Sequence, residues 1–403
     1  NYAAGGIIHQ VFIAPISKIP LRQEADFFLL DSALTGMSHQ SFMASWFHRN
    51  NYRVILSSKR QKLMNAASTY TSQAAPSLTP LLALLASDMD KVNARIIARM
   101  ASEVPLVPEL ASHLIAAGGK RLRPLLTLAG AGLAGGSPHA IGLATAVEFI
   151  HSATLLHDDV IDESKLRRGR DTANALWGND ASVLVGDFLF ARAFELMVET
   201  GNLSVLGQLS RASAQITEGE IKQMTIAGVP DTPAEDYLDV IRNKTATLFA
   251  AAAASGAEVA GASSSIIGPA HDYGMQLGMA FQIMDDAMDY SLSSDDMGKN
   301  IGDDFFDQKI TLPLIIAFGD STDTERQFWQ RTIGDGTFAD GDFEAACAIL
   351  QRYDAIDRSV AEAVRYAYAA ETALEHIAAQ NSTNPELLDA MSEAAKFAAH
   401  RQI

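Results

Sequence analysis

Hydrophobic residues recur along most of the chain at the three-to-four-residue spacing of one face of an α-helix. The pattern predicts helices over residues 81–101, 108–117, 125–133, 137–162, 183–200, 203–227, 233–254 and 265–290, of which 108–117 is short. It also predicts a short helix opening at 171–174 and further amphipathic helices in the C-terminal part, around a loop at 334–341. Short runs of alternating β-branched residues, which would predict strands, are scarce. We therefore expect an all-α protein.

Composition supports one large helical body. With 48% hydrophobic residues and 13 prolines in 403 positions, the chain can bury a sizeable core, although its length alone would allow two domains. Its single cysteine, Cys347, excludes an intramolecular disulfide framework and a cysteine-based zinc site, and it fits a reducing compartment. The net charge of -17 argues against a nucleic-acid partner. No uninterrupted apolar run reaches about 18 residues, so we expect no transmembrane segment.

The N-terminal part differs from the rest in charge. Up to Thr71 it holds seven Lys or Arg residues against three acids, whereas the remainder is strongly acidic. Such a shift marks a boundary, so we expect a basic, disordered leader over 1–75 and a folded domain over 76–403. The leader could be an organelle transit peptide or translated sequence upstream of a start at Met64. We favour the second, which predicts a cytoplasmic protein; a transit peptide would predict a mitochondrial one.

Three aspartates, Asp158, Asp159 and Asp162, end the apolar helix predicted over 137–162. Asp158 and Asp162 are four residues apart and share one helix face. Like charges at this spacing destabilise an isolated helix by about 0.2–0.5 kcal/mol, so the cluster favours a bound cation. Oxygen ligands of this kind suit Mg²⁺ that keeps waters and shares a phosphate-bearing substrate. A solvated acidic helix end is the simpler alternative.

The same D-D-x-x-D pattern returns at Asp285, Asp286 and Asp289, again at the end of a long apolar helical run. Chance repetition on two apolar helices is rare, so the second copy argues against two solvated helix ends. We find no other convincing internal repeat.

Cationic residues accompany both acidic clusters. Gly118-Gly119 precedes cations at the start of a predicted helix, where backbone N–H groups and Lys or Arg together form an anion site. A charged turn is the alternative. Nothing resembles an activated Ser or Cys nucleophile. The acidic clusters and the cations together suit the binding of two diphosphate groups, one through Mg²⁺ and one directly to Lys and Arg side chains. The cations are Lys120, Arg123, Arg167, Arg168, Lys244 and Lys299.

This combination of motifs resembles the trans-prenyltransferases, or polyprenyl diphosphate synthases, from about Leu81 to His400. The resemblance implies an isoprenoid synthase fold, a bundle of about ten core helices around a deep central cavity, with 76–403 as its catalytic domain. It also implies a homodimer, about three Mg²⁺ ions, and condensation of an allylic diphosphate such as farnesyl diphosphate with isopentenyl diphosphate.

The resemblance assigns roles to individual residues. The metal ligands would be Asp158, Asp159, Asp162, Asp285, Asp286 and Asp289. The allylic diphosphate would be held by Arg167, with Lys244, Thr245, Gln282 and Lys299 nearby. All of these except Thr245, together with Asp158, Asp159, Asp162 and Asp285, would carry catalysis. The isopentenyl diphosphate pocket would comprise Lys120, Arg123, His151 and Arg168. A histidine such as His151 on an apolar helix is otherwise usually a core residue.

Product length should depend on the helix face that leads away from Asp158. That face carries Thr154, then His151 or Ile150, then Val147, and eight residues span about 12 Å. In the resembling family, bulky aromatics four or five residues before the first aspartate stop the product early. Those positions are Thr154 and Ala153 here, which predicts a product of about 8–10 isoprene units, a quinone side-chain precursor by family analogy.

Other activities remain as alternatives. A shorter geranylgeranyl- or farnesyl-type synthase would share the chemistry. A terpene cyclase of the same fold typically replaces the second acidic motif, and a regulatory subunit would be expected to lose one motif. Both motifs are intact here, which disfavours the last two.

Overall fold

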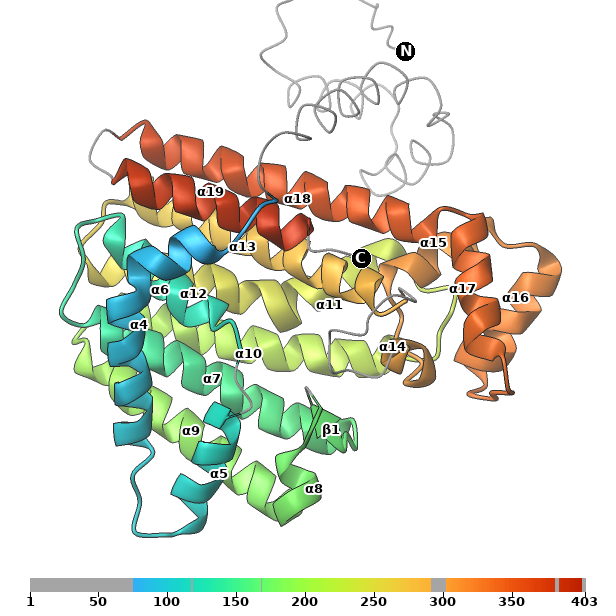
Figure 1. Cartoon of the computed structure of the whole chain (residues 1–403), viewed down its shortest axis with the longest axis horizontal. Coiled ribbons are helices and arrows are strands. Elements are labelled where there is room, and N and C mark those ends of the chain that lie inside the picture. Colours follow the sequence, from blue (N-terminus) through green and yellow to red (C-terminus); the bar gives the residue numbers. More distant parts are fainter. Residues whose placement is uncertain (1–74, 117–118, 168, 291–301, 381–383, 401–403) are drawn as a thin grey trace, which may run out of the picture. The chain divides into compact units, whose positions relative to one another are not determined.

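The computed structural model describes residues 75–116, 119–167, 169–290, 302–380 and 384–400 (Figure 1). Within these ranges the protein is helical apart from one short two-stranded hairpin, which confirms the all-α prediction. The predictions for the leader, Arg168 and Lys299 lie outside the described residues.

The elements, in chain order, are α4 Thr79–Arg99, α5 Leu106–Ala116, α6 Leu122–Gly132, α7 Ala140–Ile161, β1 Leu166–Arg167, β2 Arg170–Asp171, α8 Ala173–Trp177, α9 Asn179–Glu199, α10 Leu203–Ile226, α11 Ala234–Ile241, η3 Arg242–Ala246, α12 Thr247–Val259, α13 Ser264–Met288, α14 Asp303–Phe306, α15 Leu312–Asp320, α16 Asp323–Trp329, η4 Gln330–Gly334, α17 Asp342–Arg352, α18 Ala355–Ala378 and α19 Pro385–Ala399. Seven of the eight helices that the sequence predicts with defined bounds occur, with ends shifted by a few residues. Helix ends are the least predictable part of a hydrophobic pattern.

The alanine-rich helix α12 lies at the centre of the bundle, and its residues 247–257 are all buried. It can lie so deep because small side chains let its neighbours approach closely. A Cβ at Gly256 would come 2.1 Å from the backbone oxygen of Thr127 on α6, and one at Gly130 would come 2.1 Å from that of Ala253. The α6–α12 crossing is therefore possible only with glycine at both positions.

We expect Gly256→Ala to lower the free energy of unfolding by at least about 1–3 kcal/mol, because the added methyl group overlaps a backbone that cannot move aside. Gly268→Ala is the matched control, since Gly268 lies exposed in α13 with nothing within 4 Å of an added Cβ. That change should stabilise the protein by about 0.5–1 kcal/mol through helix propensity. Urea unfolding of both variants measures the difference, and equal stabilities would contradict this account of the crossing.

One predicted helix was wrong in detail. The hydrophobic pattern predicts a single helix over 233–254, whereas the structure has α11, a π-helical turn η3 and α12, which continues to Val259. A π turn contains one residue more than an α turn and is frequent at functional sites. Periodicity alone cannot locate such a turn, since the residues on either side stay helical.

A second, smaller core packs around the end of α13. Tyr290, Phe305 and Trp329 are fully buried there among α14 to α17. Glycine at position 302 allows the ring of Phe343 to lie against the backbone, 2.5 Å from where a Cβ would be. This packing holds Tyr290, the residue that follows the second acidic motif.

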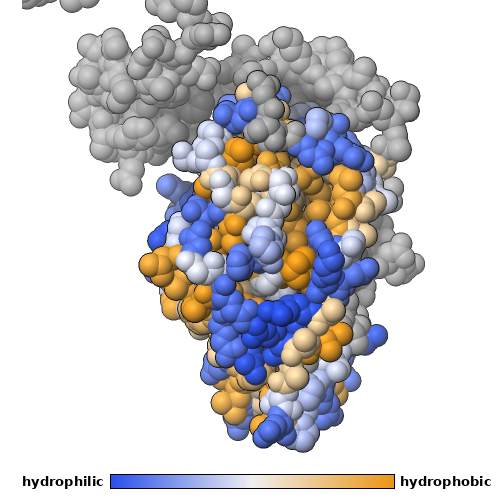
Figure 2. All heavy atoms as spheres, turned by 90° about the vertical axis from the view of Figure 1, so that its left-hand side faces the viewer, coloured by the Kyte–Doolittle hydropathy of each residue, from blue (hydrophilic) through white to orange (hydrophobic). Residues whose placement is uncertain are grey.

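Among the described helices, only α7 is long and apolar enough to cross a membrane, and 56% of its most apolar window is buried inside the bundle. Burial of this kind is typical of a core helix. On the face shown in Figure 2, hydrophobic patches are broken up by hydrophilic ones.

Candidate active site

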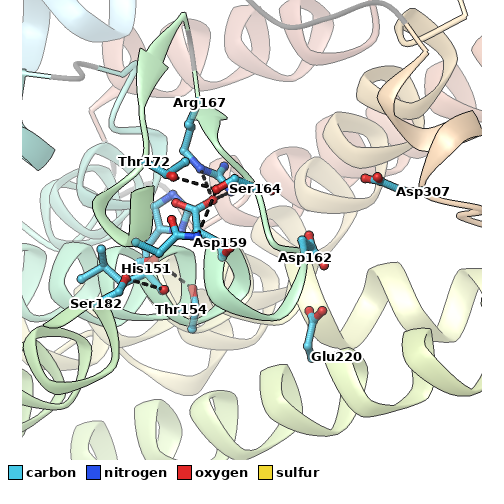
Figure 3. A network of polar contacts seen from close by, with 12 residues as sticks. His151, Thr154, Asp159, Asp162, Ser164, Arg167, Thr172, Ser182, Glu220 and Asp307 are labelled. Carbon is cyan, nitrogen blue, oxygen red and sulfur yellow. Dashed lines mark hydrogen bonds and ion pairs between the residues drawn. The ribbon is translucent and has the colours of Figure 1, made fainter. Parts of the chain in front are cut away.

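The first acidic motif ends α7. Asp159 is 4% exposed, and its Oδ1 accepts hydrogen bonds from Nε and Nη2 of Arg167 at 3.0 and 2.7 Å (Figure 3). Arg167 is on β1, and the hairpin is tied to the motif by Asn174, whose Nδ2 donates to the backbone oxygens of Asp159 and Ser164 at 3.0 and 3.1 Å. Oγ1 of Thr172 donates to Ser164 as well, at 2.7 Å. The structure therefore places Arg167 directly against the first motif.

The second acidic motif ends α13 and is part of a hydrogen-bond chain. Asp286 is 6% exposed and accepts hydrogen bonds from Oη of Tyr237 at 2.6 Å and from Nε2 of Gln282 at 2.7 Å. Gln282 in turn accepts from Oγ1 of Thr245 at 3.0 Å. The structure thus brings Thr245 and Gln282 to the second motif. Tyr237 was missed, because a lone tyrosine in an apolar helix gives no sequence signal.

Lys309 joins the two motifs, and the sequence analysis did not assign it. Its Nζ lies 3.8 Å from Asp162 of the first motif, 3.7 Å from Asp304 and 2.9 Å from Asp307. Asp304 donates its backbone N–H to Oδ2 of Asp289 at 3.0 Å, so this short helix is attached to the second motif. The sequence offers a possible signal for Lys309, which stands just before Thr311-Leu312-Pro313. The sequence analysis favours Lys299 instead, because it is nearer in sequence to the second acidic motif.

Negative charge accumulates between the motifs. Burial raises the pKa of Asp158 to about 7; Glu220 and Asp162 add to the shift, while Lys244 and Arg167 oppose it. Burial also raises the pKa of Asp286, with a contribution from Asp304. Such shifts mean that the charged carboxylates lack sufficient compensation from the protein. The site therefore has the charge and the oxygen donors that a divalent cation requires.

Within the described residues, no three Asp, Glu, His or Cys side chains converge closely enough to hold a metal ion by themselves. Asp159 and Asp286 are instead engaged by Arg167 and Tyr237. This arrangement fits Mg²⁺, which is bound through one or two carboxylates together with substrate phosphates rather than by an all-protein cage. It does not fit a closed structural metal site.

A separate cationic group lies at the start of α6. Nη1 of Arg123 lies 3.1 Å from Nε2 of His151, and its guanidinium stacks 4.5 Å from the centre of the Phe249 ring. Burial lowers the pKa of Arg123 to about 10, opposed by Glu148 and Asp285. Lys120 is exposed, with its ammonium over the ring of Phe397. The structure therefore brings Arg123 and His151 into contact. The helix begins at Leu122, so Arg123 lies inside its first turn.

Lys244 lies in η3 and is paired with an acid that the sequence analysis missed. Its Nζ is 2.5 Å from Oε2 of Glu220 on α10. A glutamate in an amphipathic helix resembles any solvated acid, so only the fold reveals that it is buried.

The residues predicted to control product length are in the core of α7. Ala153, Ile150 and Val147 are 0% exposed, while Thr154 is half-buried and donates to the backbone oxygen of His151. Phe149 faces a different direction, where it lines a small hollow with Ile96 of α4 and Leu189 of α9. The aromatic residue adjacent in sequence therefore does not block the predicted face.

Comparison with known proteins gives a consistent result. A profile of the polyprenyl synthetase family matches residues 104–350, which is more than half of the chain. The octaprenyl diphosphate synthase of Haemophilus influenzae is 41% identical over 289 residues, covering 72% of this chain and 88% of that protein. The chain belongs to the polyprenyl synthetase family.

Solved structures of the family agree. A polyprenyl synthase from Caulobacter crescentus, crystallised with calcium and isoprenyl diphosphate, has a TM-score of 0.78 and 46% identity, covering 82% of this chain and all of that one. A decaprenyl diphosphate synthase from Rhodobacter capsulatus has a TM-score of 0.76 and 47% identity, covering 81% and 99% of the two chains.

Family membership confirms the resemblance, the isoprenoid synthase fold and the enzyme class. The protein is a prenyltransferase of the polyprenyl diphosphate synthase type. Enzymes of this family are metal-dependent and use allylic and isopentenyl diphosphates as substrates. The roles of the individual site residues remain predictions. The geometry places these residues in two groups, one at the two aspartate motifs and one at Arg123 and His151.

Proposed function

We propose that this enzyme is a Mg²⁺-dependent synthase of long all-trans polyprenyl diphosphates, with products of about 8–10 units that serve as quinone side-chain precursors. The observation that carries the proposal is the pair of aspartate motifs joined through Lys309, next to the separate Arg123–His151 group. The octaprenyl and decaprenyl names of the similar proteins support the product length.

The allylic diphosphate would lie between the two motifs. Asp158, Asp162, Asp285 and Asp289 would hold the Mg²⁺ ions, about three in number, that neutralise charge on the departing pyrophosphate. Arg167 and Lys309 would stabilise the same developing charge directly. Asp159 keeps Arg167 oriented, and Tyr237 with Gln282 keeps Asp286 oriented. Asp159, Tyr237 and Gln282 would therefore act by orienting other residues of the site.

Isopentenyl diphosphate would bind to Lys120, Arg123 and His151. Arg123 is already desolvated and held flat by Phe249 and His151, so little ordering is needed when a diphosphate arrives. The double bond of this substrate attacks the allylic carbocation, and the proton that is then lost passes to the released pyrophosphate. The buried apolar helices around the site exclude water from the cation.

We also propose a homodimer. Exposed apolar side chains follow one face of α9 at seven-residue spacing, Leu184, Ala191 and Val198, and Leu184 and Val198 are 67% and 63% exposed. Ile221 and Met224 on α10 are 57% and 60% exposed. An exposed patch of this kind is typical of a protein interface, and a second copy would cover it with the same helices. As a localisation we propose the cytoplasm, or the mitochondrion if the leader is a transit peptide.

Leu184→Asp should convert the dimer to a monomer, because a charge would be buried in the interface. Tyr368→Asp is the control, since Tyr368 is also a large exposed side chain but belongs to α18 on the other side of the bundle (Figure 1). Sedimentation velocity gives the masses. A monomeric wild type, or a dimeric Leu184→Asp variant, would refute the proposed interface.

The proposed activity is tested by incubating the chain with farnesyl diphosphate, labelled isopentenyl diphosphate and Mg²⁺, followed by chromatography of the dephosphorylated products. A ladder ending at about 8–10 units is expected. A ladder that ends at about four units would support the proposed condensation but refute the proposed product length. No incorporation by the folded protein would refute the proposed function.

A further inference from the structure

A buried carboxylate faces the lysine that we place near the allylic diphosphate. Glu220 is 7% exposed, and its Oε2 lies 2.5 Å from Nζ of Lys244. Figure 3 shows the side chain pointing from α10 toward the end of α7, where Asp162 lies. None of the roles derived above uses Glu220.

The backbone is shaped to bring these two residues together. A Cβ at Gly219 would lie 2.6 Å from the backbone nitrogen of Lys244 and 2.9 Å from Cβ of Asn243. Glycine at this position therefore lets α10 touch the π turn η3 that carries Lys244. The ion pair is a consequence of this close contact rather than of two flexible side chains meeting at the surface.

Both members of the pair belong to the diphosphate pocket. Glu220 points toward Asp162 of the first motif (Figure 3), and Lys244 directly precedes Thr245, whose hydroxyl donates to Gln282 beside the second motif. The positive charge of Lys244 is compensated by Glu220 in this structure. An arriving diphosphate must therefore share the ammonium group with a carboxylate that is already in place, and a departing pyrophosphate leaves a lysine that is immediately paired again.

We propose that Glu220 is a positioning residue that holds Lys244 as its counter-ion and, by competing for it, weakens the binding of pyrophosphate so that this product can leave after each condensation. The inference rests on the proposed function. Glu220 acts through Lys244 and touches no reacting atom.

Inorganic pyrophosphate is the probe, and its affinity is measured by calorimetry with saturating Mg²⁺ and by inhibition of condensation. Glu220→Gln keeps the shape of the side chain and removes its charge, so pyrophosphate should bind about tenfold more tightly, the effect of one close charge pair. Glu218→Gln is the matched control, because Glu218 is exposed on the same helix. Its affinity for pyrophosphate should equal that of the wild type. Unchanged or weaker binding by Glu220→Gln would overturn the proposal.

A second comparison separates positioning from a general structural role. In a Lys244→Met background, Glu220→Gln should no longer strengthen pyrophosphate binding, and a persistent effect would overturn the link to Lys244. Glu220→Asp keeps the charge but shortens the side chain, and its pyrophosphate affinity should lie between those of the wild type and Glu220→Gln. If Glu220→Gln does not fold, the pyrophosphate affinity of Glu220→Asp is compared with that of the wild type instead. The wild type tests the proposed function independently, since it must incorporate isopentenyl diphosphate whatever Glu220 does.

Discussion

Asp158→Asn should lower kcat for condensation about a thousandfold, the scale expected when one group that stabilises the developing charge of a transition state is lost. Asparagine retains the size of the side chain but is a poor ligand for Mg²⁺. The protein should remain folded, because burial disfavours the charged form of Asp158 and the neutral amide removes that cost. Single-turnover assays with labelled isopentenyl diphosphate, together with thermal unfolding, measure both quantities.

Asp180→Asn serves as the control, since Asp180 is an exposed aspartate in the first turn of α9. Its activity should match that of the wild type. If Asp158→Asn retained more than about a tenth of the wild-type rate, a far smaller loss than transition-state groups show, the first motif would not have the role proposed for it.

Ala153→Phe should shorten the product from about 8–10 units to a few units while initial condensation continues, since only the space for the growing chain is reduced. Ala153 is 0% exposed in α7, so the ring must enter the core and should cost about 1–3 kcal/mol of stability. Chromatography of the dephosphorylated products gives the length distribution, and Ala153→Tyr should behave in the same way.

Ser152→Phe is the matched control for product length. It adds the same ring one residue earlier, where Ser152 lines the hollow shared with Phe149 and Leu189. Its product should keep the wild-type length. An unchanged length in Ala153→Phe, or equal shortening in both variants, would place the path of the chain elsewhere.

Much of the fold and the site could be predicted from sequence. Helix periodicity located nearly every long helix, because burial of one face dominates the choice of structure in an amphipathic segment. The two acidic motifs were recognisable since their residues are adjacent in sequence. Arg167 was also predictable, as it follows the first motif by a few residues and the hairpin returns it to Asp159.

The remainder depends on contacts between distant segments. Tyr237 is 49 residues from Asp286 in sequence, and nothing in its local pattern indicates that its hydroxyl meets that carboxylate. The pairing of Glu220 with Lys244 depends on the close approach of α10 and η3, which Gly219 permits. Lys309 reaches Asp162 only because the second core folds α14 back toward the site. Sequence spacing carries no information on such tertiary contacts.

The π turn η3 makes this part of the chain intolerant of a change in residue number. A π turn contains one residue more than an α turn, so removing one residue from Arg242–Ala246 would convert η3 into a regular α turn. The backbone of Lys244 would then move relative to α10, and the ammonium group would lose its place opposite Glu220. The number of residues between Tyr237 and Gly256 should therefore be the same in related chains that keep this site, which makes the length of this segment a diagnostic feature when such chains are aligned.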